Sequence, residues 1–214
     1  MKSIKINLLV ALLAAIMFSG NAAASDAFEG YKLYKSYCMV CHGVEGEGDG
    51  PLAGKLGGTK PAELTDAARV GKRSDKQLFQ IIQGTADHAK IDGKMPRWGL
   101  AISGPQIKSL VAYIRFLHES KHSVLGDPEL GKQIYLKSCA ACHGPSGKGD
   151  GVMTNVLDMQ PADHTKSGSM GSESNERLLE IVRDGGDGYM PAWKGILSDE
   201  EITAVVGYIR LLSY

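Results

Sequence analysis

Two copies of one five-residue pattern decide the architecture of this chain: Cys38-Met39-Val40-Cys41-His42 and Cys139-Ala140-Ala141-Cys142-His143. They use all four cysteines among the 214 residues. A glycine and a tyrosine precede each first cysteine at steps of four: Gly30, Tyr34 and Cys38 in one copy, Gly131, Tyr135 and Cys139 in the other. Because similarity at a long fixed spacing marks a repeated structural unit, we infer a tandem duplication.

The repeat continues on the C-terminal side of both patterns. A glycine loop at residues 46–50 recurs at residues 147–151, a spacing of 101. Met95-Pro96-Arg97-Trp98 recurs as Met190-Pro191-Ala192-Trp193, at a spacing of 95. The shorter spacing places deletions in the second copy, mainly in the loop before its methionine. We predict two domains, residues 25–121 and 122–214, with a short polar linker around residues 118–127.

Both copies have the patterns of helices. Each copy ends in apolar residues at steps of three and four, which form one stripe along a helix. The stripes are Ile107, Leu110, Val111, Ile114 and Leu117, and Ile202, Val205, Val206, Ile209 and Leu212. Capping-box patterns predict helix starts at Ser74, Ser103 and Ser198. No alternation with a period of two indicates a strand, so the expected fold class is all-α.

The N-terminus has the pattern of an export signal. Lys2 and Lys5 precede an apolar run from Leu8 to Phe18, and small residues follow at positions 22–25. A membrane-spanning helix needs about 20 apolar residues, so this shorter run predicts a cleaved signal peptide at residues 1–24. The expected location is therefore the periplasm, without stable membrane insertion after cleavage. An uncleaved anchor is the alternative.

The composition limits the partners. The chain has 24 Lys and Arg against 24 Asp and Glu, and 43% of its residues are hydrophobic. These values are those of a globular protein rather than of a disordered chain. Binding to nucleic acid through its phosphates needs an excess of positive charge, which is lacking here, so we expect no nucleic acid partner.

The pattern C-x-x-C-H is the attachment signature of a c-type haem. Two cysteines form thioethers to the haem, and the adjacent histidine binds the iron from one side. This predicts two covalent haem c groups, attached at Cys38 and Cys41 and at Cys139 and Cys142, with His42 and His143 as axial ligands. Two other chemistries use the same residue types. A redox-active cysteine pair usually lies in a strand-helix unit, and a zinc site needs a fourth ligand in each copy.

The aligned methionines predict the second axial ligand of each iron. Met95 lies 53 residues after His42, and Met190 lies 47 after His143. Electron-transfer haems commonly bind a methionine, which raises the reduction potential. A histidine is the rival ligand. His88 and His164 are the candidates, although they do not align between the copies.

These motifs together resemble the class I c-type cytochromes, in a form with two haems, and the resemblance covers the chain after the signal. It implies two tandem cytochrome c-like helical domains, each wrapped around one covalent haem. It also implies that the first and last helices of each domain cross at a glycine beside two tyrosines: Gly30 with Tyr34 and Tyr113, and Gly131 with Tyr135 and Tyr208. In this family a proline carbonyl accepts the N–H of the axial histidine. Pro61 and Pro161 are the residues expected to supply it, and Pro51 is the alternative in the first copy.

The resemblance implies an electron carrier. An iron bound by both histidine and methionine has no free position for a substrate, so we expect no catalytic residues and no enzyme activity. The expected partners are redox proteins: a membrane or periplasmic reductase as donor, and a terminal oxidase or reductase as acceptor. The alternative is a haem enzyme of the peroxidase or thiosulfate-oxidising type, or an electron-transfer subunit of an oxidoreductase complex. The loop charges differ before the two methionines, with His88, Lys90, Asp92 and Lys94 in one copy and Asp184 and Asp187 in the other. More negative charge near the C-terminal haem predicts a lower potential there.

Overall fold

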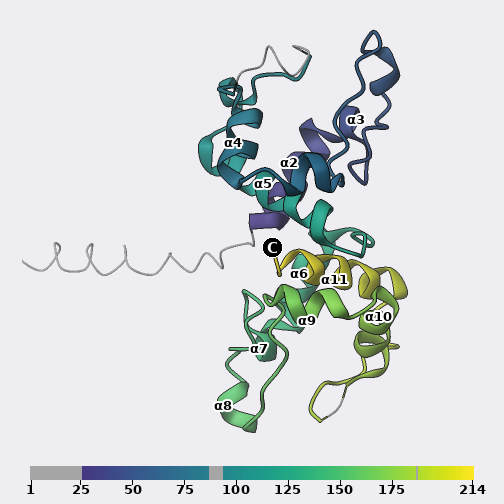
Figure 1. Cartoon of the computed structure of the whole chain (residues 1–214). Coiled ribbons are helices and arrows are strands. Elements are labelled where there is room, and N and C mark those ends of the chain that lie inside the picture. Colours follow the sequence, from purple (N-terminus) through teal and green to yellow (C-terminus); the bar gives the residue numbers. More distant parts are fainter. Residues whose placement is uncertain (1–25, 87–93, 187) are drawn as a thin grey trace, which may run out of the picture.

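A computed structural model describes residues 26–86, 94–186 and 188–214 (Figure 1). Within these residues the secondary structure is helical, and the one β-type pairing is an isolated bridge between Lys194 and Leu197. The predicted all-α class is therefore confirmed. Among the described residues no helix is both long and apolar enough to cross a membrane. The predicted signal peptide, residues 1–24, lies outside the described part.

The helices divide into two lobes with a similar order of elements, except that η4 of the N-terminal lobe has no counterpart in the described part of the C-terminal lobe. The N-terminal lobe contains α2 (Asp26–Tyr37), α3 (Met39–His42), η1 (Ala53–Lys55), η2 (Ala67–Gly71), α4 (Asp75–Gln83), η4 (Trp98–Leu100) and α5 (Gly104–Glu119). The C-terminal lobe contains α6 (Pro128–Ser138), α7 (Ala140–His143), α8 (Thr154–Leu157), α9 (Ser167–Ser172), α10 (Asn175–Asp184) and α11 (Asp199–Leu211). Figure 1 shows the two lobes one above the other, with the C-terminus between them.

The helix starts follow the sequence patterns. The three predicted capping boxes form at Ser74, Ser103 and Ser198, where each serine hydroxyl accepts a backbone N–H and the third residue accepts the serine N–H. Asp127 caps α6 by accepting the backbone N–H of Glu129. Each such cap contributes about 1 kcal/mol to helix stability. The caps thus determine where the preceding loops end and the helices begin.

In each lobe the first helix crosses the last at a glycine. A side-chain carbon added at Gly30 would lie 1.9 Å from the Ser109 carbonyl oxygen on α5. The corresponding carbon at Gly131 would lie 1.9 Å from the Ala204 oxygen on α11. The tyrosine rings beside these crossings pack at 5.1 Å (Tyr34 with Tyr113) and at 5.3 Å (Tyr135 with Tyr208). The packing roles implied by the family resemblance are confirmed.

The two lobes share one hydrophobic core. Phe28 of α2 packs edge-on against Tyr208 of α11, with ring centroids 5.2 Å apart. Phe116 of α5 meets Tyr214 at 5.3 Å. At the edge of this contact, Lys132 of α6 lies 3.7 Å from the carboxylate of Glu29. Aromatic rings from both lobes therefore hold the lobes together.

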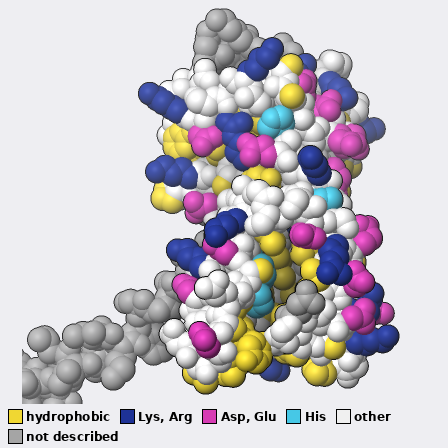
Figure 2. Space-filling model, turned by 60° about the horizontal axis from the view of Figure 1, so that its bottom comes forward, with side chains coloured by type: hydrophobic (Ala, Val, Ile, Leu, Met, Phe, Trp, Pro, Cys, Tyr) yellow, Lys and Arg dark blue, Asp and Glu magenta, His cyan; other side chains and the backbone are white. Residues whose placement is uncertain are grey.

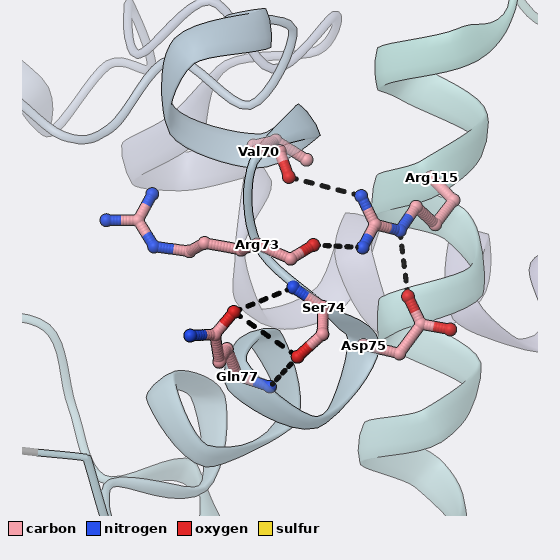
Figure 3. Close-up of polar contacts among 6 residues, drawn as sticks. All are labelled: Val70, Arg73, Ser74, Asp75, Gln77 and Arg115. Atoms are coloured by element: carbon pink, nitrogen blue, oxygen red, sulfur yellow. Dashed lines mark hydrogen bonds and ion pairs between the residues drawn. The ribbon is translucent and has the colours of Figure 1, made fainter.

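In each lobe an arginine on the last helix binds the segment that precedes the middle helix, α4 or α10. In the N-terminal lobe Arg115 donates to the Asp75 carboxylate at 2.8 Å, to the Val70 carbonyl at 3.1 Å and to the Arg73 carbonyl (Figure 3). Figure 3 also shows the Ser74–Gln77 capping box directly beside this cluster. These bonds tie the segment between η2 and α4 to α5.

The corresponding arginine of the C-terminal lobe is more deeply buried. Arg210 is 3% exposed, and it donates to Asn175 at 2.8 Å, to the Glu173 carbonyl at 2.6 Å and to the Met170 carbonyl. A buried guanidinium is costly unless its donors are satisfied, and here they bind a side-chain amide oxygen and two backbone carbonyls. The segment from α9 to α10 is thereby held against α11.

Candidate cofactor sites

The C-terminal lobe encloses a cavity of about 900 Å³. Its lining brings together Cys139, Cys142, His143, Met190 and Trp193, which come from the start and body of α7 and from the loop between α10 and α11. Figure 2 shows a hollow in this lobe, walled by hydrophobic side chains and bordered by charged ones. The volume is within the range of cofactor pockets, and the sulfur and imidazole donors are those of a c-type haem.

The N-terminal lobe has the corresponding cavity, with a volume of about 250 Å³. Cys38, His42 and Met95 line it, whereas Cys41 is not among its described lining residues. Trp98 packs instead against Tyr37, with ring centroids 5.5 Å apart. The donor set fits the same group as in the other lobe.

Each cavity histidine is oriented by a backbone carbonyl. The Nδ1 atom of His42 lies 2.9 Å from the Ala62 oxygen, and that of His143 lies 3.1 Å from the Ala162 oxygen. Burial lowers the pKa of both imidazoles, so they are neutral at pH 7. A neutral imidazole that donates from Nδ1 keeps a lone pair on Nε2, and this is the atom a metal binds.

The prediction that Pro61 and Pro161 supply these carbonyls is wrong by one residue. The Pro61 carbonyl faces the glycine loop, where a side-chain carbon at Gly48 would lie 2.5 Å from its oxygen. The Pro161 carbonyl has the same relation to Gly149, at 2.6 Å. Successive carbonyls of an extended segment point in opposite directions, so the alanine after each proline faces the histidine.

The cysteine environment does not match the two alternative chemistries. Burial, with a smaller contribution from the neighbouring cysteine, raises the pKa of both Cys38 and Cys139 to about 12. A redox-active cysteine instead needs a lowered pKa, because the thiolate is the reactive form. The described residues also contain no group of three or more His, Cys, Asp or Glu side chains placed to hold a metal ion. The raised pKa of Cys38 and Cys139 therefore does not favour a redox-active cysteine pair.

His164 is not placed as a ligand opposite His143. The two imidazoles are stacked, with centroids 4.4 Å apart and an angle of 19° between their planes. Two imidazoles that bind one iron from opposite faces have the metal between their nitrogens, and therefore cannot stack face to face. His88 lies outside the described residues, as do Lys90, Asp92 and Asp187 from the predicted charge difference.

Sequence reasoning missed several residues that shape the sites. It did not identify the Ala62 and Ala162 carbonyls or the stacking of His164. It also missed cations that line the N-terminal cavity, namely Lys60, Arg69 and Arg73. The alignment of the two copies contained one signal for His164, because Leu64 occupies the corresponding position of the first copy.

Known proteins match this chain along most of its length. A family model described as cytochrome c oxidase, cbb3-type, subunit III, matches residues 25–114 and again 126–209. The oxidase subunit FixP of Bradyrhizobium diazoefficiens is 29% identical, over 86% of this chain and 60% of that protein. The oxidase subunit CcoP of an Azospirillum species is 30% identical, over 86% of this chain and 61% of that protein. Cytochrome c4 of Thiocapsa roseopersicina is 28% identical, over 82% of this chain and 87% of that protein.

The chain spans about 60% of the length of the FixP and CcoP proteins that it matches. The two matched segments fall on the two lobes, and each lobe holds one C-x-x-C-H motif beside a cavity with the donors of a c-type haem. The cofactors are therefore two covalently bound haem c groups. This chain belongs to the cytochrome c family described as subunit III of the cbb3-type oxidases, and it is a diheme c-type cytochrome with two tandem helical domains.

Proposed function

We propose that this protein carries single electrons between redox proteins of a respiratory chain in the periplasm, after removal of residues 1–24. The observation that carries the proposal is the same in both lobes. A C-x-x-C-H histidine and a methionine from a distant loop line one cavity. Haem c, when bound, supplies one-electron chemistry. We assign one haem to each of two domains, residues 25–121 and 122–214.

The residues of each lobe have separate tasks. Cys38 and Cys41 hold one haem covalently, and Cys139 and Cys142 hold the other. His42 and His143 would bind the irons through Nε2, because Nδ1 is engaged by a backbone carbonyl in each lobe.

Met95 and Met190 would supply the second ligand of each iron. Two other methionines, Met159 and Met170, also line the C-terminal cavity. Met190 is preferred over both because it is the one that aligns with Met95, which lines the N-terminal cavity. With a histidine and a methionine as ligands, each haem would supply one-electron chemistry and would leave no position for a substrate, so we assign a carrier rather than an enzyme.

The partners are redox proteins, with a membrane or periplasmic reductase as the donor and a terminal oxidase or reductase as the acceptor. The names of the matched FixP and CcoP proteins favour an oxidase as the acceptor, and they support a second candidate function, that of a subunit within such a complex. Purification of the tagged protein in mild detergent separates the two. A carrier elutes alone, whereas a subunit elutes with the oxidase.

The test of the ligand assignment is optical spectroscopy of the oxidised protein, with haem counted by mass spectrometry. We expect two haems per chain and a weak sulfur-to-iron charge-transfer band. Met95→Ala and Met190→Ala should each remove about half of that band, and the matched control Met159→Ala should leave it intact. At neutral pH the reduced wild-type protein should not bind carbon monoxide. Binding of carbon monoxide, or a band that survives both substitutions, would contradict the proposal.

A further inference from the structure

One position beside the axial histidine differs between two otherwise equivalent loops. The backbone N–H of Leu64 donates to the Gly46 carbonyl at 2.6 Å, and that of His164 donates to the Gly147 carbonyl at the same distance. Each of these residues lies two positions after the alanine whose carbonyl orients the axial histidine. The two loops therefore present a hydrocarbon side chain in one lobe and an imidazole in the other.

The imidazole of His164 is buried and in contact with the iron ligand. It is 7% exposed, and its ring stacks on that of His143. Its Nδ1 lies 3.4 Å from the hydroxyl oxygen of Tyr135, which also lies 3.1 Å from the Gly144 carbonyl. In the N-terminal lobe, Tyr34 makes the corresponding bond at 2.6 Å. His164 thus inserts a polar ring between the tyrosine and the axial ligand.

The physical consequence concerns the charge of the iron. The oxidised haem carries one more positive charge than the reduced haem, and apolar surroundings disfavour that charge. The polarity and hydrogen bonding around a metal site therefore affect its reduction potential. We propose that His164 lowers the potential of the C-terminal haem below that of the N-terminal haem. This inference rests on the proposed function, in which both haems carry electrons.

The charges that line the two cavities also favour a lower reduction potential for the C-terminal haem than for the N-terminal haem. The N-terminal lining contains three cations, Lys60, Arg69 and Arg73, and no carboxylate among its described residues. The described C-terminal lining contains Lys166 and Arg177 together with Asp163 and Glu173. Positive charge near a haem favours its reduced state. Solvent and salt screen exposed charges, so the buried imidazole makes the larger contribution.

The order of potentials gives the protein a direction. Electrons pass spontaneously from the haem of lower potential to the haem of higher potential. The C-terminal lobe therefore accepts electrons from the donor, and the N-terminal lobe passes them to the acceptor.

The experiment is a redox titration of the purified protein with both haems attached, followed by absorbance. His164→Leu gives the second lobe the residue of the first, and Leu64→His makes the reciprocal change. The wild type should titrate in two waves. His164→Leu should raise the midpoint potential of the lower wave. The expected shift is about tenfold in the ratio of reduced to oxidised haem at a given potential, which is about 59 mV for one electron. Leu64→His should lower the upper wave, and each substitution should leave the other wave in place.

A third variant and a second readout make the outcome decisive. His164→Gln keeps a buried polar group and should lie between the wild type and His164→Leu, which a merely structural role would not produce. If the waves of His164→Leu and Leu64→His coincide with those of the wild type, the inference is wrong. The charge-transfer band and haem count of the same samples test the proposed function separately. Intact bands with unmoved waves overturn this inference alone.

Discussion

The helix crossing of the C-terminal lobe allows a quantitative prediction for Gly131→Ala. The new methyl group would lie 1.9 Å from the Ala204 carbonyl oxygen and 3.0 Å from Cβ of Tyr208. Contacts under 3.0 Å are essentially never observed for such a carbon, so α6 and α11 must separate by at least about 1 Å. A gap of that size removes a quarter to a half of the dispersion attraction between facing atoms.

The expected cost follows from two opposing effects. Overpacking of a well-packed core costs about 3 kcal/mol at the upper end of its usual range. Replacement of glycine by alanine inside a helix returns about 1 kcal/mol through helix propensity. The free energy of unfolding should therefore fall by about 2 kcal/mol.

Guanidinium denaturation of the oxidised protein, followed by circular dichroism, measures this change as a lower midpoint with an unchanged slope. The matched control is Gly168→Ala in α9, where an added carbon meets no atom within 4 Å. It should be neutral or stabilise by no more than about 1 kcal/mol. If Gly131→Ala denatures at the same midpoint as this control, the close crossing of α6 and α11 is not a constraint on the fold.

Three further predictions follow from the core, the anchoring arginines and the caps. Phe28→Ala should destabilise the protein by about 3 to 5 kcal/mol and split a single calorimetric transition into two, since the ring joins the lobes; a single transition would show that the remaining contacts suffice. Arg210→Gln should cost more stability than Arg115→Gln in chemical denaturation, because the partner carboxylate of Arg115 is largely exposed; equal losses would contradict this. The backbone N–H of Ser198 holds the pKa of Glu201 below its ordinary value of 4.5, so this cap stabilises the fold above that pH and the gain is lost as pH falls through the lowered pKa. Glu201→Gln should flatten the loss of stability below pH 4.5, and an unchanged pH profile would refute the assignment.

The sequence by itself determined the architecture, because the relevant signals are local or periodic. The duplication is visible in the spacing of the two C-x-x-C-H motifs. The helix starts at Ser74, Ser103 and Ser198 depend on residues three positions apart, and a capping box forms within one turn whatever the rest of the chain does. The cavity-lining methionines Met95 and Met190 were identified by their alignment, since equivalent loops in a repeat lie in equivalent places.

Only the tertiary structure decided how the residues around each cavity meet. The direction of a single carbonyl depends on backbone dihedral angles, so the sequence pointed to Pro61 where the Ala62 oxygen accepts the histidine N–H. The stacking of His164 on His143 joins residues 21 positions apart through the path of a loop that has no period. The shared core around Phe28 joins helices from the two copies, and no pattern within either copy specifies which of its surfaces faces the other. Such contacts depend on the packing of distant segments, and local spacing carries no information about them.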